Sequence, residues 1–566
     1  MNRIRRTVIL GISVLGILFA FGGLFTARTE TTPVFRAGCP SVFSGTVTAR
    51  DGREGFILSL PGSWDAGKIT LELEGSECLY LGKEKKEIRP EQETDLREYL
   101  GMKTPVYNAK MRQLGNLVVY RGSEIPALFL EVDEKQLIRA NANKDYEITS
   151  GRAVYCEADG TVSYDGLLSQ MKGRGNNTFA YTKKPYQVKL AEKASLSGMN
   201  KAKTWVLLAN WNDVSLLRNQ IVLDMARAAG LRNAVSCVQA DVWINGRYNG
   251  LYLVAEKVQI KKGRLELRDL EEETEKVNSQ PVSSFSMFLD KTNRSYPLLR
   301  GYRIPENPED ITGGYIMTIE KYARLRDYKL PGFRTKKELS VQIKEPTYPS
   351  REQAEYLANL VNEMHLAMIA DDGVNTETGK YYTEYIDAES FAVKFLIEDW
   401  SKDYDFIGGS QFMYKDSDDR DPLIYAGPAW DYDLAFGNLG DRGTSATGNY
   451  ITAVSHKTGN IWWVLSRHDD FMDLVREIWM ERFRPAAAVL LGEREVGKGS
   501  IVRSLDGYAE AIQDSAKMNY ARWNVSKTTF EKSAGSFENA VSYLKKWITG
   551  RTGFMDGEYG ITEKHE

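Results

Sequence analysis

The segment from Tyr381 to Asn438 constrains the fold of this chain more than any other part of the sequence. Apolar residues at helical spacing predict a helix over residues 388–397. Two short strands are predicted after it, at 411–414 and 423–426, with an acidic turn between them. The segment therefore combines a helix with a β-hairpin, and the loops on both sides of that hairpin are rich in aspartate.

Two groups of carboxylates flank the predicted hairpin. Asp399, Asp403 and Asp405 precede it, and Asp431 and Asp433 follow it. Phosphoryl transfer uses such an arrangement, because one carboxylate faces the attacking hydroxyl while another holds a divalent metal on the phosphates. Aspartate is also common in turns, where its side chain bonds the local backbone, so a structural role is the alternative. Aromatic neighbours favour the catalytic interpretation, since a partly buried carboxylate needs a metal or a basic partner.

A glycine-rich turn is predicted earlier in the chain, between two strands within residues 169–190. It contains Gly173, Arg174, Gly175 and Asn176. The glycines would let the backbone approach a ligand closely, and Arg174 could face phosphate groups. Lys189, on the returning strand, could reach the same phosphates as a point charge. A tight hairpin with solvated lysines is the structural alternative.

These segments resemble the spore coat protein H (CotH) kinase family of atypical protein kinases. Family members carry motifs similar to GRGN-(S/T)-(W/F) and KKPY, and a later motif similar to GP-x-WD-(F/Y)-(D/N)-x-x-FGN. The resemblance covers roughly residues 125–554. It rests on Gly173–Phe179 (GRGNNTF), Lys183–Leu190 (KKPYQVKL), Leu217–Asn219 (LRN), Gly250–Glu256 (GLYLVAE) and Gly427–Asn438 (GPAWDYDLAFGN).

The resemblance implies an α+β, two-lobed fold distantly like a protein kinase. It also implies binding of ATP with Mg²⁺ or Mn²⁺ and transfer of the γ-phosphoryl group to a protein hydroxyl, with serine as the first candidate. Asp405 aligns with the family's acidic position ahead of the hairpin and is the expected catalytic carboxylate. Asp431 is expected to chelate the metal, with help from Asp433, where some members carry Asn. The segment Gly408–Gln411 lacks an Asn that some members supply as a second metal ligand.

The same resemblance extends to the nucleotide. It implies that the glycine-rich turn and Lys189 hold the phosphates, and it places Glu256 at the edge of the nucleotide cleft. Two alternatives lie outside catalysis. One is a surface adhesin that keeps the fold without the chemistry. The other is a cell-envelope polysaccharide-assembly factor, which would bind glycan through its β domain or through exposed tryptophans among Trp462, Trp463, Trp479, Trp523 and Trp547.

The amino terminus predicts an exported protein. Arg3, Arg5 and Arg6 precede an uncharged, mostly apolar run over residues 7–26, which is long enough to span a bilayer. Arginines on that side keep the short end in the cytoplasm and place the large domain outside. We therefore expect a single-pass anchor in the cell membrane, an extracytoplasmic catalytic domain and an envelope protein as substrate. A cleaved signal peptide is the rival interpretation.

Composition and patterning divide the rest of the chain. With 566 residues, a net charge of −3 and no long basic run, the chain holds more than one domain and is a poor candidate for binding nucleic acid. The expected units are a cytoplasmic tip and anchor (1–28), a linker (29–41), a small antiparallel β domain (42–120), a nucleotide-binding lobe (121–260), an exposed insertion (261–312) and a large helical, catalytic lobe (313–560).

Local signals within these units are more specific. Helices are predicted over 213–229 and 351–369, and Asn245-Gly246 predicts a hairpin turn within 240–258. The segment 415–421 (KDSDDRD) resembles half of a calcium-binding loop but lacks its glycine and distal glutamate, so it is predicted to be a hairpin tip.

The four cysteines follow no zinc-binding pattern. Cys39, Cys78, Cys156 and Cys237 are too widely spaced for one. An exported chain could join them in two disulfides, and buried free thiols are the equal alternative.

Overall fold

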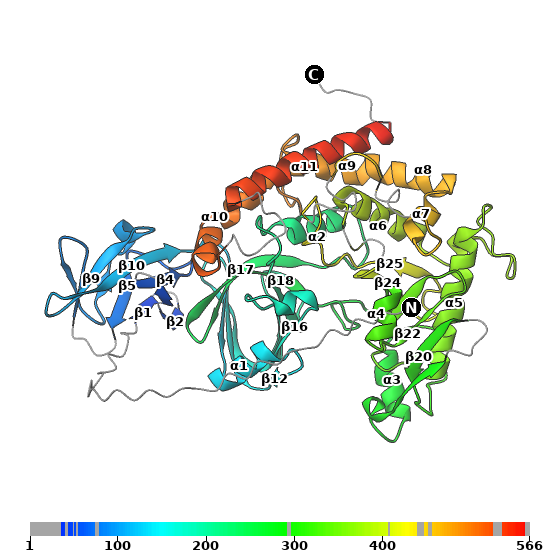
Figure 1. Ribbon diagram of the computed structural model, residues 1–566, viewed down its shortest axis with the longest axis horizontal. Helices are drawn as coiled ribbons and strands as arrows, with labels where there is room; N and C mark the ends of the chain where they lie inside the picture. Colours follow the sequence, from blue (N-terminus) through cyan, green and yellow to red (C-terminus); the bar gives the residue numbers. More distant parts are fainter. Residues whose placement is uncertain are drawn as a thin grey trace, which may run out of the picture.

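The computed structural model describes residues 35–39, 43–48, 50–52, 55–73, 78–290, 296–403, 405, 408–438, 446–450, 456–524 and 535–560. Its strands and helices confirm the α+β class. The N-terminal strands lie at one end of the molecule and a seven-stranded sheet at the other, while a twelve-stranded sheet lies between them (Figure 1). The predicted anchor, residues 1–28, lies outside the described residues. None of the helices in the described ranges is long and apolar enough to span a membrane.

The N-terminal region is almost entirely β-structure, as predicted, but it is continuous with the rest of the protein. Its hydrophobic core includes Phe129, Trp243 and Met518 of the main domain. Strands β4 and β10 pair in parallel, so the region is not purely antiparallel. A six-stranded sheet contains β3 (Arg50–Gly52), β4 (Gly55–Leu60), β10 (Gln113–Arg121), β9 (Thr104–Asn108), β6 (Leu79–Leu81) and β7 (Lys86–Ile88).

The twelve-stranded sheet forms the centre of the molecule. The turn between β17 and β18 is Asn245-Gly246, as predicted, and both residues have the positive φ angles that this turn requires. The sheet contains β1 (Phe35–Cys39), β2 (Phe43–Thr48), β5 (Ile69–Leu73), β8 (Glu93–Thr94), β11 (Ala127–Glu131), β12 (Glu147–Ile148), β13 (Gly151–Cys156), β14 (Val162–Gly173), β15 (Tyr186–Ala194), β16 (Ala202–Leu208), β17 (Cys237–Ile244) and β18 (Arg247–Glu256).

The seven-stranded sheet corrects one predicted boundary. Residues 261–312 were expected to form an exposed insertion, yet two of their strands belong to this sheet. Phe288 and Leu299 are buried in its core, because they pack under the long helix α5. In spatial order the strands are β19 (Met287–Asp290), β20 (Leu298–Tyr302), β22 (Gly332–Arg334), β23 (Ser340–Glu345), β21 (Tyr315–Ile319), β24 (Gln411–Lys415) and β25 (Ile424–Ala426).

Helices from the second half of the chain cover one side of the molecule (Figure 1). Ser350 and Gln353 form a capping box at the start of α5, which explains why that helix begins where the sequence predicted. The helices are α1 (Glu134–Ala142), α2 (Arg218–Ala228), α3 (Leu270–Val277), α4 (Tyr322–Asp327), α5 (Arg351–Ile369), α6 (Ala388–Ser401), α7 (Ile461–Leu465), α8 (Asp469–Ile478), α9 (Arg484–Leu491), α10 (Leu505–Arg522) and α11 (Phe537–Glu558).

The tryptophans of this helical region belong to the core. Trp462, Trp479, Trp523 and Trp547 are buried, and Trp463 is half-buried against the same cluster. A glycan platform would need exposed rings. These residues therefore give no support to the polysaccharide-binding alternative.

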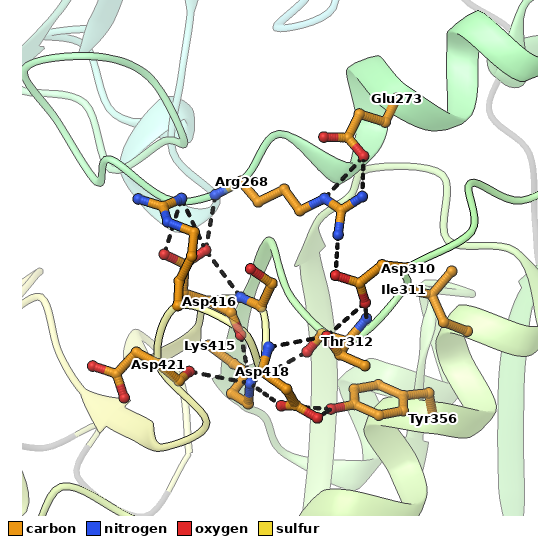
Figure 2. A network of polar contacts seen from close by, with 12 residues as sticks. Arg268, Glu273, Asp310, Ile311, Thr312, Tyr356, Lys415, Asp416, Asp418 and Asp421 are labelled. Atoms are coloured by element: carbon orange, nitrogen blue, oxygen red, sulfur yellow. Dashed lines mark hydrogen bonds and ion pairs between the residues drawn. The ribbon is translucent and has the colours of Figure 1, made fainter.

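The acidic tip of the β24–β25 hairpin is organised around an internal cation. The side chain of Lys415 is fully buried, and its Nζ donates 2.7 Å to Asp418 Oδ1 and also to the backbone carbonyls of Thr312, Asp416 and Asp421 (Figure 2). The lysine ammonium takes the central position among these oxygens. The prediction of a hairpin tip is thus confirmed. The oxygens that make the segment resemble a calcium-binding loop surround the ammonium of Lys415.

Three of the cysteines are free thiols. Cys156 is buried, and Cys78 and Cys237 are half-buried. Two disulfides would need all four cysteines, so these three free thiols exclude that arrangement in this structure.

Candidate functional site

A cavity of about 280 Å³ lies between the twelve-stranded and seven-stranded sheets. The β14–β15 connection and the segment after β16 form its wall on the first side. The ends of β21, β23 and β24 form the opposite wall, and the segment after β25 closes it. The cavity therefore brings the predicted glycine-rich turn and the predicted acidic hairpin, which are far apart in the sequence, into one place.

The cavity is lined by three of the predicted carboxylates, Asp405, Asp431 and Asp433. Ser410 Oγ donates to Asp431 Oδ2 at 3.1 Å, and Asn212 Nδ2 donates to Asp433 Oδ2 at 3.2 Å. Ser410 occupies the segment where some CotH-like sequences supply an Asn. The Ser410 hydroxyl oxygen therefore lies beside Asp431, in the segment that lacks the Asn expected as a second metal ligand.

The backbone turns these two carboxylates toward the cavity by burying the residue between them. Tyr432 is fully buried, its N–H donates to Asn219 Oδ1 at 2.7 Å, and its hydroxyl donates to Glu398 Oε1 at 2.6 Å. Asp431 itself has φ 73°, a left-handed conformation that is strained for a residue with a side chain. Such strain persists only when the surroundings hold it, and it concentrates at functional sites.

The three aspartates before the hairpin have different environments. Asp399 forms a fully buried ion pair with Arg551, 2.9 Å from Asp399 Oδ2 to Arg551 Nη2, and so ties α6 to α11. Asp403 is also buried, and its Oδ2 accepts the backbone N–H of Asp405 at 3.2 Å. Burial, and then the charge of Glu398, raises the pKa of Asp403 well above its usual range. Of these three, Asp405 alone lines the cavity.

Asp405 has a basic neighbour. Lys321, which follows β21, places its Nζ 3.0 Å from Asp405 Oδ1, and both side chains are partly exposed. This ion pair fixes the direction of the Asp405 side chain, which lines the cavity.

The buried Asp433 is poorly compensated. It is 7% exposed, and burial, followed by the nearby charge of Asp431, raises its pKa to about 8. No lysine, arginine or histidine in the described ranges forms an ion pair with Asp431 or Asp433. Two carboxylates, an amide and a hydroxyl suit Mg²⁺ or Mn²⁺, which commonly use one or two protein carboxylates together with substrate phosphates. Within the described ranges, no group of three or more His, Cys, Asp and Glu side chains could hold a metal by itself.

Cationic side chains line the cavity as well. Arg174, from the β14–β15 connection, has its guanidinium 5.3 Å from the centre of the Trp430 ring. Lys344, from β23, and Arg324, from α4, line the cavity as well, and Arg324 pairs with Glu320 at 3.4 Å. Neither Lys344 nor Arg324 could be predicted from the sequence, because neither lies in a motif. Lys344 reaches the cavity through the pairing of β23 with β21, and Arg324 lies in α4, which follows β21.

The remaining predicted nucleotide contacts divide into two groups. Gly175 and Asn176 line the cavity, while Gly173 lies beneath it, where a Cβ would come 2.2 Å from the Phe179 ring. The structure does not bring Lys189 or Glu256 to this cavity. The side chain of Lys189 is exposed and does not line the cavity, and Glu256 forms a buried ion pair with Arg264 at 2.7 Å.

A comparison with protein-family models identifies the family of the chain. The family model described as "CotH kinase protein" matches residues 171–555 of the chain, which is about two thirds of its length. A search of curated proteins finds no significant match. The matched region begins just before the glycine-rich turn and ends near the end of α11, so it contains every residue of the cavity.

Proposed function

The chain belongs to the CotH kinase protein family, and we propose that it binds ATP with Mg²⁺ or Mn²⁺ and transfers the γ-phosphoryl group to a hydroxyl of a protein substrate, serine being the first candidate. The observation that carries this proposal is the set of charged side chains around the cavity. Asp405, Asp431 and Asp433 line it, and so do Arg174 and Lys344. Phosphoryl transfer is catalysed mainly by positioning and by charge stabilisation, and such a cavity supplies both.

The cations and the carboxylates have distinct parts in this proposal. Arg174 and Lys344 hold the phosphate oxygens by charge-assisted hydrogen bonds. Asp431 and Asp433 hold the divalent metal, which when bound neutralises charge on the phosphates. Asp405 orients the acceptor hydroxyl and takes up its proton, while the ion pair with Lys321 fixes the direction of Asp405.

An aromatic pair could receive the base of the nucleotide. Tyr181 and Trp211 both line the cavity, and their rings are stacked with centroids 5.9 Å apart. Trp211 is held in turn by an edge contact with Trp523. Stacking of a base on a fixed aromatic ring is favourable and tolerates different bases. We therefore place the adenine of ATP against Trp211.

The cellular setting is part of the same proposal. The two sheets on either side of the cavity would be the two lobes of a kinase-like domain. Residues 1–28 would anchor the protein in the cell membrane, with the cavity on the extracytoplasmic side and an envelope protein as acceptor. The non-catalytic alternatives, a surface adhesin or a polysaccharide-assembly factor, require no nucleotide.

Metal-dependent nucleotide binding tests the proposal. A ligand that binds only the folded state stabilises it by about 2.7 kcal/mol at one hundred times its dissociation constant. ATP with Mn²⁺ should therefore raise the Tm of the purified chain, and Asp431→Ala should remove most of that increase. Asp419→Ala, at the exposed hairpin tip, is the matched control and should behave like the parent. An equal increase in the parent and in Asp431→Ala would show that Asp431 does not hold the metal, and no increase in any variant would favour the non-catalytic alternatives.

A further inference from the structure

Helix α10 is bonded to the twelve-stranded sheet along one of its faces. Ser515, Asn519 and Trp523, the residue directly after the helix, are four residues apart and therefore follow the same face. All three side chains are buried. Each forms a hydrogen bond with β17 or β18, and the partners, in the same order, are Asp241, Leu251 and Asn249. This row of hydrogen bonds fixes the end of α10 on the central sheet.

Asn519 is the central residue of this row. Its Oδ1 accepts from Lys183 Nζ at 3.0 Å and from the backbone N–H of Leu251 at 3.1 Å. Lys183 is as deeply buried as Asn519, and its ammonium also donates to the carbonyl oxygen of Leu251 and lies 4.5 Å from the centre of the Tyr252 ring. A buried ammonium is costly unless its donors are satisfied. The KKPY motif therefore contributes a lysine that joins α10 to β18 and does not line the cavity of the proposed active site.

Gly250 makes this close contact possible. Its φ of 124° is a conformation that residues with a side chain rarely adopt. A Cβ at this position would lie 2.8 Å from Lys183 Cε, 2.9 Å from Asn519 Oδ1 and 2.9 Å from Trp523 Nε1. Non-bonded contacts between carbon atoms are usually about 3.5–4.0 Å, so any other residue would push the end of α10 away from β18.

The last member of the row reaches the proposed nucleotide site. Trp523 Nε1 donates 2.9 Å to the carbonyl oxygen of Asn249, and the guanidinium of Arg522 lies 4.0 Å from the centre of the Trp523 ring. The Trp523 ring meets Trp211 edge to face, with centroids 6.1 Å apart and planes at 79°. Trp211 is half-buried in a turn after β16 and lines the cavity. The contact with Trp523 therefore sets the direction of the Trp211 ring, together with the stacked ring of Tyr181.

We propose that Lys183, Gly250 and Asn519 are positioning residues for the base of the nucleotide. They fix the end of α10, and Trp523 then holds Trp211 in the orientation against which adenine stacks. This inference rests on the proposed function, because it requires the base of ATP to lie against Trp211. None of the three positioning residues lines the cavity, so they act on the base through the two tryptophans and leave the phosphates unaffected.

Two ligands that differ by the nucleoside test this inference. ATP and inorganic tripolyphosphate share the phosphate chain, and each is titrated calorimetrically with Mn²⁺ into the purified chain. Asn519→Leu removes the accepting oxygen and keeps a similar volume. It should weaken ATP binding about tenfold, on the scale of one base stacked on an aromatic ring, and leave the affinity for tripolyphosphate unchanged. Gln513→Leu, on the exposed face of the same helix, is the matched control and should bind both ligands like the parent.

The possible failures can be told apart. Unchanged ATP affinity in Asn519→Leu would overturn the inference. An equal loss of affinity for both ligands would also overturn it, because a merely structural defect would not distinguish the base from the phosphates. Absence of ATP binding by the parent would refute the proposed function itself.

Two further variants keep the test decisive. Trp523→Phe retains a ring at the end of α10, so it should fold even if Asn519→Leu does not, and it should weaken ATP binding at least threefold without changing tripolyphosphate binding. Unchanged ATP affinity in Trp523→Phe would contradict the inference. Trp211→Leu removes the surface on which the base stacks, so adding Asn519→Leu or Trp523→Phe to it should cause no further loss of ATP affinity. Losses of equal size with and without Trp211 would show that these residues do not act through it.

Discussion

Asp433 should destabilise the fold at neutral pH when no divalent cation is bound. Burial and the charge of Asp431 raise its pKa from an ordinary value of 3.8 to about 8. The folded state therefore holds this proton more tightly than the unfolded state does. The resulting stabilisation is present at low pH and is lost as the pH rises through the folded pKa.

The size of the effect follows from that shift. Each pH unit between the two pKa values changes the free energy of unfolding by about 1.4 kcal/mol. Asp433→Asn removes the ionisable group and keeps an oxygen that can accept from Asn212 Nδ2. Relative to the parent, the variant should gain about 2.7 kcal/mol more stability at pH 7 than at pH 5, because two pH units separate these conditions.

Urea denaturation of both proteins at pH 5 and pH 7, in buffer with a chelator, measures this difference. Asp419→Asn, at the exposed hairpin tip, is the control and should show no pH-dependent gain. Saturating Mn²⁺ should reduce the advantage of Asp433→Asn, because the ionised carboxylate of the parent then has a cation beside it. A stability difference that does not change between pH 5 and pH 7 would refute the assignment of a buried, uncompensated carboxyl group at this position.

Two further predictions concern the cations of the cavity and the contact between α6 and α11. Lys344→Met should weaken binding of ATP with Mn²⁺ by about tenfold to a hundredfold, which is the contribution of one charged hydrogen bond. Lys189→Met should leave the dissociation constant unchanged. A titration in which Lys189→Met weakens binding and Lys344→Met does not would identify Lys189 as the phosphate ligand. Arg551→Met should lower the free energy of unfolding by about 3–5 kcal/mol, because it removes the arginine that pairs with the fully buried Asp399. A loss below about 1 kcal/mol in denaturant unfolding would mean that this pair does not hold α6 to α11.

Local elements could be predicted well from the sequence. Helix α6 begins at Ala388, and the strands β24 and β25 lie within one residue of their predicted bounds, because helical spacing and acidic turns are short-range signals. The same holds for the turn at Asn245-Gly246. The aspartates on either side of the hairpin could likewise be recognised as one candidate site, because the hairpin itself brings them together.

Properties that depend on packing could not be predicted in the same way. Tyr186 and Val188 are buried in β15 while Lys189 is exposed, and the alternation alone does not say which face of the strand meets the cavity. Lys344 reaches the site only through the pairing of β23 with β21, which no local sequence pattern predicts. The strands within residues 261–312 were missed for a related reason, since charged and polar residues around α3 masked the buried positions Phe288 and Leu299.

The division among the three aspartates before the hairpin shows the same limit. Their spacing gave no reason to separate Asp399 from Asp405, although the resemblance favoured Asp405. Arg551, more than one hundred residues later in the chain, forms an ion pair with Asp399, and Asp403 is buried in the protein interior. Asp405 remains at the cavity because the chain leaves α6 at Lys402, whose left-handed conformation ends the helix there.

Transfer of labelled γ-phosphate by Asp405→Asn, measured beside a nucleotide-binding titration, tests the central claim most directly. The substitution keeps the shape of the side chain and removes the charge that orients the acceptor hydroxyl and takes its proton. General-base and positioning effects are each worth about 10²-fold or more. We expect the variant to bind ATP and Mn²⁺ about as well as the parent and to transfer phosphate to a serine-bearing protein, or to itself, at least 10²-fold more slowly. Transfer by Asp405→Asn at the parental rate would contradict this account.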